Sequence, residues 1–317
     1  MTSLHWLTQF IEVLAALVAA PMFVGWISQC RAWLQNKSAP PLLQPYRGIR
    51  KLFHKDAVLA THASPLFRIA PYVVFGSMVC AAAVIPSLGT RLPFSDAADA
   101  IALVGLFATA RVFMSLAAMD VGTAFGSLGA RREMLVGFLA EPALLMVIFL
   151  ASLIATSTSL PAISESLATQ SLALYPSLAF TGVAFLLVLL AENARIPVDN
   201  PATHLELTMI HEAMLLEYSA RHLALMEWAA ALKLFNYACI GFALFLPWGA
   251  ATGDAPAPVT LLASIPILGL KLFGAGAVLA LIETVSAKLR IFRAPEFLAT
   301  AFLFAVLGLL VHLLLGA

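Results

Sequence analysis

The residues best suited to chemistry in this chain lie between positions 191 and 218, in the segment AENARIPVDNPATHLELTMIHEAMLLEY. These 28 positions hold five of the chain's 17 acidic residues, together with His204 and His211. Carboxylates and imidazoles that lie close together can pass protons to one another through bridging water. Because only 11% of the chain is charged, so dense a cluster predicts a site of proton transfer.

The local sequence predicts a helix that brings some of these residues onto one face. Asn200 followed by Pro201 is typical of a helix start, so we expect a helix over 201–218. Glu206 and Glu217 are eleven residues apart, about three helical turns, and would share a face. The alternative interpretation is an ordinary amphipathic helix with a solvated face.

A metal site in the same segment is a weaker alternative. His204, His211 and Glu212 could meet on another face of the helix. The His211-Glu212 pair lacks the second histidine of a zinc-protease motif, because position 215 is leucine. The chain also has no nucleophile motif and no glycine-rich phosphate loop, so we expect it to hold no catalytic, cofactor-binding or metal-binding residue.

The elements that position these residues are expected to be membrane helices. The chain is 62% hydrophobic with a mean hydropathy of +0.95, and its 11% of charged residues compares with roughly 25% in soluble domains. Its net charge of +1 gives no sign of nucleic-acid binding. Apolar segments of about 20 residues, the length that crosses a bilayer, recur along it. We predict an all-α polytopic protein, a single integral membrane domain over 1–317 with about eight transmembrane helices, at 5–29, 69–89, 100–119, 134–156, 173–192, 222–247, 259–283 and 296–315.

The distribution of basic residues predicts the orientation of these helices. The odd-numbered loops carry many Lys and Arg residues, whereas the even-numbered loops carry only Arg91. The positive-inside rule therefore places both termini on the non-cytoplasmic side and the long loops, about 31–68 and 193–221, in the cytoplasm. Long charged loops on one side suit the docking of a soluble partner. The candidate interface residues, in or beside a short interfacial helix expected at 42–52, are Gln44, Arg47, Arg50, Lys51 and Lys55.

Several ionisable residues fall inside the predicted spans, among them Glu12, Glu141, Arg111, Lys233 and Lys271. Each such residue costs about 2.5–3.5 kcal/mol at a helix centre, so it usually pairs with another charge or lines a water path. Buried ion pairs that hold helices together are one interpretation. We favour a proton path, because the three cations lie in three different predicted helices, which is more than packing requires.

The segment after residue 191 resembles the membrane subunit that sits at the quinone chamber of respiratory complex I. The matching elements are Glu192, Arg195-Ile196-Pro197-Val198-Asp199, Glu206-Leu207 and Glu217-Tyr218. In the first loop, Leu43-Gln44-Pro45 and Lys51-Leu52-Phe53-His54-Lys55-Asp56 are similar to that family's L-Q-P and K-L-F-x-K-E motifs. The resemblance covers most of the chain, and eight spans with both termini outside also fit it.

The chain departs from the quinone-reducing branch of that family. Ala202, Thr203 and His204 stand where that branch has further acidic residues, and the separation of Glu206 from Glu217 is about three residues longer. The string from Arg195 onward is instead similar to the membrane subunit of formate hydrogenlyase and hydrogenase-4 type enzymes. The motifs Asp120-Val121-Gly122, Leu128-Gly129-Ala130-Arg131-Arg132-Glu133 and Glu141-Pro142 fit this branch as well.

This resemblance implies a non-catalytic membrane subunit of a NiFe hydrogenase complex in a bacterial inner membrane. Its partners would be soluble hydrogenase large and small subunits, an iron–sulfur protein and antiporter-like membrane subunits. The NiFe centre and the iron–sulfur clusters would belong to those partners, because Cys30, Cys80 and Cys239 form no C-x-x-C motif. This chain would anchor the redox modules and couple their electron transfer to proton or ion translocation.

The two lines of reasoning lead to one hypothesis about residues. Glu141, Glu192, Glu206, Glu212 and Glu217 would form an acidic funnel from the cytoplasmic face to the membrane middle, joined by Arg111, Lys233 and Lys271. Arg195 and Asp199 would pair to fix the loop. Three alternatives remain: a quinone-reactive subunit of a complex I-like NADH dehydrogenase, a stand-alone secondary ion transporter, and a passive anchor.

Overall fold

The computed structural model describes residues 3–60, 62–90, 93–94, 99–169, 176–199, 209–251, 258–287, 289 and 293–315. Its helices are α1 (Ser3–Leu34), α2 (Gln44–Phe53), α3 (Pro65–Val84), α4 (Ala100–Asp120), α5 (Ala124–Ala155), α6 (Leu160–Thr169), α7 (Ser177–Glu192), α8 (His211–Leu215), α9 (Ala220–Phe245), α10 (Pro258–Val285) and α11 (Ala294–Leu315). The described residues form no β-strand, so the predicted all-α class is confirmed.

Most of these helices are long and apolar enough to cross a membrane. Within the described ranges seven meet that condition, namely α1, α3, α4, α5, α9, α10 and α11. The remaining expected span, 173–192, corresponds to α7, which has 16 residues, fewer than the roughly 20 that cross a bilayer. Residues 170–175, ahead of α7, lie outside the described ranges. The chain is a polytopic membrane protein, as its composition predicts.

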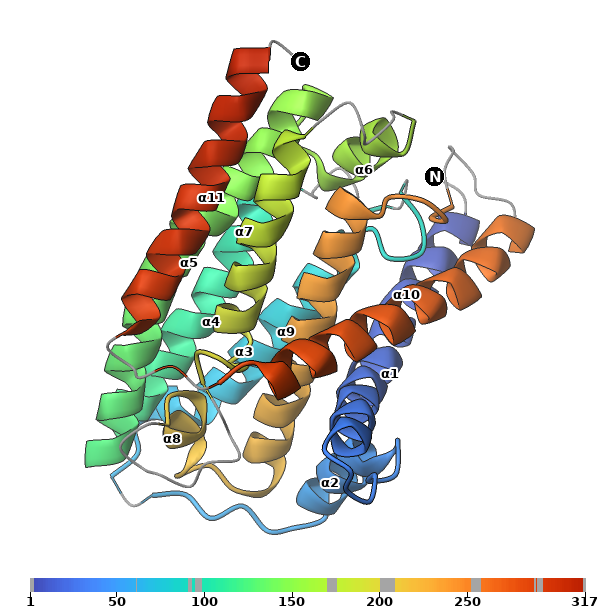
Figure 1. Cartoon of the computed structure of the whole chain (residues 1–317). Helices are drawn as coiled ribbons and strands as arrows, with labels where there is room; N and C mark the ends of the chain where they lie inside the picture. Colours follow the sequence, from blue (N-terminus) through green and yellow to red (C-terminus); the bar gives the residue numbers. More distant parts are fainter. Residues whose placement is uncertain are drawn as a thin grey trace.

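The helix bundle has two chemically different ends (Figure 1). α1 begins and α11 ends at one end, which we call the terminal end and which also holds α6. α2 and α8, which belong to the two long charged loops, lie at the opposite end, called here the loop end. Both termini therefore share a side, which an even number of crossings requires. That this side faces away from the cytoplasm stays a prediction.

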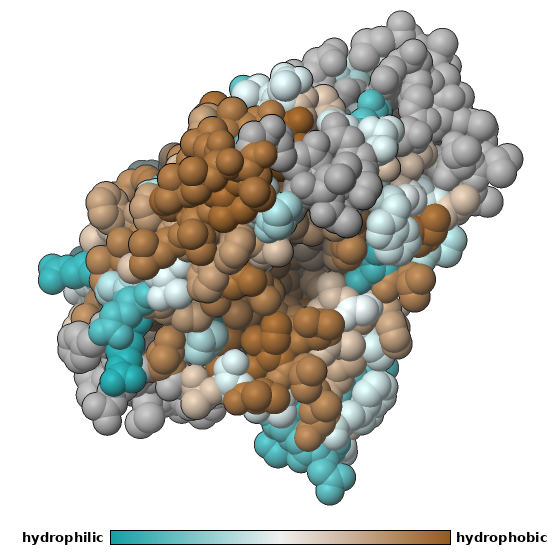
Figure 2. Space-filling view, turned by 45° about the horizontal axis from the view of Figure 1, so that its top comes forward, coloured by the Kyte–Doolittle hydropathy of each residue, from teal (hydrophilic) through white to brown (hydrophobic). Residues whose placement is uncertain are grey.

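Small residues allow the helices to approach one another closely. α7 packs against α5 and α11, α3 against α4 and α9, and α1 against α9 and α10. Ala70, Ala117, Ala140, Ala184 and Ala305 are completely buried in these contacts, and small side chains are the usual contact residues between membrane helices. On the face drawn in Figure 2, apolar side chains cover most of the central surface, as contact with lipid requires, and hydrophilic side chains gather at its left and lower edges.

Two helix starts determine the register of the charged residues described below. Asp99 caps α4 by accepting a hydrogen bond from Ile101 N at 2.9 Å. Thr123 caps α5 by accepting one from Gly126 N at 3.3 Å. Side-chain caps of this kind satisfy backbone donors at the first turn and so fix where a helix begins. The rotational position of every later side chain in α4 and α5 follows from these starts.

The loop between α7 and α9 differs from its prediction. The described part of the helix expected over 201–218 is only α8, and Glu217 lies in the turn that follows it. The helix ends early because Ser219 takes an extended conformation, with φ −138° and ψ 163°, to start α9. Residues 200–208, which include His204 and Glu206, lie outside the described ranges. The short helix expected at 42–52 is present as α2.

Candidate functional site

The guanidinium of Arg111, in α4, is the centre of a buried group of charges. Arg111 is only 7% exposed. Its Nε lies 3.7 Å from Glu133 Oε1, its Nη1 donates to Glu141, and its Nη2 donates to both carboxylate oxygens of Glu192. One cation from α4 thus joins two carboxylates of α5 and one of α7.

A glycine in α5 provides the space for this cation. Glu133, Gly137 and Glu141 are four residues apart and lie on one face of the helix. A Cβ atom at Gly137 would lie 2.6 Å from Arg111 Cδ and Cζ, which is closer than non-bonded carbon atoms approach. The missing side chain therefore lets Arg111 enter between the two glutamates.

Glu192, the last residue of α7, connects this group to α9. Its carboxylate is 3.0 Å from Lys233 Nζ, and the Tyr237 hydroxyl also hydrogen-bonds to it. Lys233 and Tyr237 are four residues apart, so they extend from the same face of α9. Glu192 is 5% exposed, so both of its cationic partners interact with it in a largely dehydrated environment.

Arg111, Lys233, Glu133, Glu141 and Glu192 together are called here the Arg111 network. Its numbers of positive and negative charges differ when every group is ionised. Arg111 and Lys233 supply two positive charges, and Glu133, Glu141 and Glu192 supply three negative ones. The two cations share the Glu192 carboxylate, and Arg111 also holds the two carboxylates of α5.

A cavity of about 390 Å³ gives access to the network from the loop end. Glu192 and Lys233 form part of its wall, and Glu212 and His211 from α8 form another part. Glu283 in α10 also lines it, 3.0 Å from Arg195 and 3.5 Å from Arg31. The walls thus combine carboxylates, a histidine and cations around a space large enough for several waters.

Arg195 and Asp199, predicted to pair with each other, each hold a different part of the loop. The Arg195 guanidinium pairs with Glu283. Asp199 Oδ2 accepts hydrogen bonds from the backbone N–H groups of Ile210 at 3.2 Å and His211 at 3.1 Å, at the start of α8. An aspartate at a helix N-terminus satisfies backbone donors that have no partner within the helix. The structural role of the two residues stays a prediction.

The remaining predicted site residues are placed in several regions. Glu141, Glu192, Lys233 and Arg111 come together in the network, and Glu212 lines the adjoining cavity. Lys271 lies elsewhere: its ammonium donates to the carbonyl oxygen of Leu246, just beyond α9. Glu217 lies in the turn after α8, and Glu206 is outside the described ranges. The candidate interface residues, all exposed in or just after α2, are Gln44, Arg47, Arg50, Lys51 and Lys55.

Tyr218, in the matched Glu217-Tyr218 motif, has a structural position. Its ring stacks on Phe67 with centroids 4.1 Å apart, and its hydroxyl donates to the Phe67 carbonyl oxygen at 3.0 Å. Burial, and secondarily the carboxylate of Asp120, raise the pKa of the Tyr218 phenol. The phenol therefore joins the loop to α3.

Sequence reasoning did not select four residues that complete the site: Glu133, Tyr237, Arg31 and Glu283. Glu133 could have been found, because it precedes Glu141 by eight residues and so shares its helical face. Glu283 could have been found as a charge at the end of an apolar run. The contacts of Arg31 and Tyr237 join helices far apart in sequence, and no local pattern indicates them.

Comparison with known proteins gives consistent results over nearly the whole chain. Residues 8–314 match the protein family described as NADH dehydrogenase. The chain is 36% identical to hydrogenase-4 component C of Escherichia coli (strain K12) over 241 residues, 76% of this chain and 75% of that protein. It is 32% identical to formate hydrogenlyase subunit 4 of the same organism over 302 residues, 94% of this chain and 95% of that protein.

Among solved structures, the chain superposes on a subunit of the membrane-bound sulfane sulfur reductase (MBS), an archaeal respiratory membrane complex. The TM-score is 0.81 at 19% sequence identity, and the match covers 96% of this chain and 98% of the other. At this identity the superposition demonstrates a shared fold.

Proposed function

Because this chain belongs to the family described as NADH dehydrogenase, we propose that it is the integral membrane subunit of a NiFe hydrogenase complex of the formate hydrogenlyase or hydrogenase-4 type. Its relatives with 36% and 32% identity carry those names. The chain anchors soluble redox modules and couples their electron transfer to proton translocation. The observation that carries this proposal is Glu192, which is held by Arg111 and Lys233 and lines a cavity at the loop end.

The partners are hydrogenase large and small subunits, an iron–sulfur protein and antiporter-like membrane subunits, assembled in the bacterial inner membrane. The NiFe centre and iron–sulfur clusters reside in those partners. Cys30 and Cys239 are buried in α1 and α9, whereas Cys80 is exposed on α3, and no cluster of potential metal ligands occurs among the described residues. The absence of a C-x-x-C motif from the sequence is what supports placing the redox centres in the partners.

The coupling step follows from the competition of two cations for one carboxylate. A negative charge that arrives on a docked redox module draws a proton into the cavity at the loop end, where Glu192 and Lys233 form the inner wall. When Glu192 binds this proton, Arg111 and Lys233 lose their shared anion, and Arg111 retains Glu133 and Glu141. When the negative charge on the redox module is removed, Glu192 releases this proton toward the membrane interior.

The exposed basic residues of α2 form the docking surface for the redox modules. Arg47, Arg50 and Lys51 are exposed on this amphipathic helix, and Ile49 on its other side is buried. α2 packs on α9 and α1, and Pro45, Gly48 and Ile49 also line the cavity. A partner bound on α2 therefore lies next to the residues through which the proton enters.

A quinone-reactive role is the second candidate, supported by one observation. The cavity of about 390 Å³ falls within the range of small-molecule sites, ~300–1,000 Å³. Val24, Pro45, Ile49 and Leu234 give it an apolar side suited to a quinone ring. Inhibition of the purified complex by quinone analogues distinguishes the two functions, because the hydrogenase function predicts no inhibition.

The proposal is tested by purifying the tagged chain from mild detergent and by assaying membrane vesicles. We expect a nickel-containing large subunit and iron–sulfur subunits to co-purify in equal amounts, and vesicles to translocate protons while they produce hydrogen from a reduced dye. A chain that purifies alone or as a homo-oligomer would contradict the subunit assignment and support a stand-alone transporter. Hydrogen production without proton translocation would leave only the passive anchor.

A further inference from the structure

A second buried carboxylate, Glu12 in α1, lies toward the terminal end of the bundle. Glu12 is 1% exposed. Its Oε1 accepts hydrogen bonds from Ser87 N and Ser87 Oγ at 2.8 Å and from Leu88 N at 2.9 Å. Its Oε2 is buried and has no hydrogen-bond partner in the part of the chain that the structure describes. A buried carboxyl oxygen with no partner requires a proton, a water or a cation.

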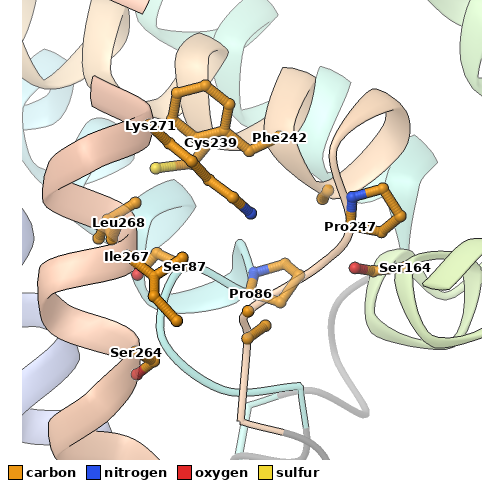
Figure 3. Close-up of a pocket in the computed structure, with 13 residues that line it drawn as sticks. Pro86, Ser87, Ser164, Cys239, Phe242, Pro247, Ser264, Ile267, Leu268 and Lys271 are labelled. Carbon is orange, nitrogen blue, oxygen red and sulfur yellow. The ribbon is translucent and has the colours of Figure 1, made fainter. Parts of the chain in front are cut away.

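Lys271 lines the same small cavity as Ser87, the residue whose hydroxyl donates to Glu12. Lys271 Nζ donates to the carbonyl oxygens of Leu246 at 2.6 Å and Trp248 at 2.5 Å. An ammonium group has three donors, so one remains for another acceptor. Figure 3 shows the Lys271 side chain extending from α10 into a small cavity, with Pro86 near its tip in this view and Ser264 well away from it. Cys239 is within electrostatic range of both Glu12 and Lys271.

The cavity between these groups is suited to an ordered water. Its volume is about 20 Å³, which is enough for one water molecule. Ser87, Ser164, Ser264 and Lys271 contribute polar groups to its lining. Ser87 is the shared element, because it lines the cavity and its Oγ also donates to Glu12. A water in this space would complete a chain of hydrogen bonds between the carboxylate and the ammonium.

A second polar pair, Thr90 and Glu165, follows this site in the direction of the terminal end. Thr90, three residues after Ser87, is 2% exposed. Its Oγ1 donates to Glu165 Oε1 at 2.6 Å. Glu165 is half-buried in α6, and α6 lies at the terminal end of the bundle (Figure 1). The hydroxyl groups of Ser87 and Thr90 can each donate and accept a hydrogen bond, as a proton relay requires.

α9 connects this site with the Arg111 network. Lys233, Asn236 and Cys239 are three residues apart on one side of this helix. Lys233 and Cys239 are therefore separated by roughly 9 Å along the helix axis. Between them, Asn236 is completely buried, its Nδ2 donates to Met78 O at 3.0 Å, and its Oδ1 has no partner among the described residues. A free buried acceptor at this level can hold a water between the two sites.

We infer that Glu12 is a second proton-binding group of this chain, which exchanges its proton with the terminal side through the water-sized cavity beside Lys271 and through Ser87, Thr90 and Glu165. Only O–H bonds form and break in this transfer: the proton moves between the Glu12 carboxylate and the cavity water, and no oxidant or reductant takes part. The inference rests on the proposed function only for the direction in which the proton moves. Of the described titratable groups, Cys239 from α9 interacts electrostatically with Glu12, and Lys271 from α10 interacts with Cys239 in turn.

Infrared difference spectroscopy of the purified complex tests proton binding independently of hydrogen production. A pH step is expected to change the C=O stretch of a protonated carboxylic acid, with a shift in D₂O, and this change should be absent from Glu12→Gln. The side-chain amide of that variant still offers an oxygen to Ser87 N and Leu88 N, so the fold is retained. Glu296→Gln, at an exposed glutamate of α11, is the matched control and should keep the signal. A carboxylic signal that persists unchanged in Glu12→Gln would overturn the inference.

Proton translocation in vesicles tests the role of the same group in transport. Glu12→Gln and Lys271→Gln are expected to cause loss of most of the protons moved per hydrogen produced, because each substitution removes an ionisable group of the proposed path. Glu12→Asp should restore part of the transport, and Glu296→Gln should match the unmodified complex. Normal translocation in Glu12→Gln would overturn the relay. Absence of translocation in the unmodified complex would instead overturn the proposed function, while the infrared result would still decide whether Glu12 binds a proton.

Discussion

Arg111 in α4 and Glu192 at the end of α7 form the ion pair that joins the two sides of the site, with Arg111 Nη2 bonded to both oxygens of Glu192. Glu133 and Glu141 extend this pair into α5, and Lys233 extends it into α9. Four helices thus converge on one pair of residues. The pair is buried, yet Glu192 also lines the cavity at the loop end.

Replacing Gly137 by valine should disrupt the network without removing a charge. The added side chain would overlap Arg111 Cδ and Cζ, 2.6 Å from the new Cβ, and overpacking of this kind costs typically 1–3 kcal/mol. We expect a lower thermal midpoint of the detergent-solubilised complex and loss of coupled proton transport. Gly105→Ala, at an exposed position of α4 where a Cβ meets no atom within 4 Å, is the control and should leave both unchanged. Equal effects of the two substitutions would argue against the packing role of Gly137.

The contact of Arg195 with Glu283 should appear as an energetic coupling. The Glu283 side chain is 1% exposed and lies 3.0 Å from Arg195. Among the described residues, removing Arg195 leaves this buried carboxylate with the longer contact to Arg31, at 3.5 Å. Coupled pairs of this kind interact by about 0.5–3 kcal/mol. In thermal unfolding, Arg195→Gln combined with Glu283→Gln should lower the midpoint by less than the sum of the single changes. Simple additivity would show that the pair contributes no interaction energy.

Reversing the charges of α2 should release the soluble modules. We expect the combined substitutions Arg47→Glu, Arg50→Glu and Lys51→Glu to abolish co-purification of hydrogenase subunits. The three exposed positions would then carry negative charges, which repel an acidic surface on the partner. Lys37→Glu reverses an exposed charge in the same loop outside α2 and should keep the complex intact. Quantitative mass spectrometry of the purified complex measures the ratio of subunits. An unchanged ratio in the α2 variant would place the docking surface elsewhere.

Tyr218 should affect stability at alkaline pH and leave proton transport unchanged. Burial raises the pKa of its phenol, so its contribution to stability is fully present below the ordinary tyrosine value of about 10 and is lost as the pH rises toward the folded-state value. Tyr218→Phe keeps the ring on Phe67 and removes the hydrogen bond to its carbonyl oxygen, a loss of about 1 kcal/mol. The decline of thermal midpoint above pH ~10 should be shallower in this variant. A changed ratio of protons to hydrogen would indicate a transport role for Tyr218.

The sequence predicts most of the fold because membrane helices are recognised from composition alone. The apolar runs of α1, α3, α4, α5, α9, α10 and α11 are long and nearly free of charge, and no water is present to support other backbone structures in the bilayer. α7 and the loop after it were predicted less well. Their lengths depend on local turns, such as the extended Ser219 that starts α9.

The sequence predicts which residues belong to the candidate site better than it predicts which of them are in contact. A charge within an apolar span is visible in the sequence, and Arg111, Glu141 and Lys233 were found in this way. Which of them meet depends on helix rotation and on gaps such as that at Gly137, so Lys271 was grouped with residues from which it is separate. Arg195 likewise has Glu283 as a partner 88 positions away, a pairing that no local spacing reveals.

The central claim is that Glu192 passes protons during hydrogen production, and one substitution tests it most directly. Glu192→Gln keeps the shape of the side chain and removes its charge, so the complex should assemble with its full set of subunits. In membrane vesicles with a reduced dye as electron donor, we predict that this variant still produces hydrogen but loses most of the proton translocation per hydrogen formed. An unchanged ratio of protons to hydrogen in assembled Glu192→Gln would contradict the account.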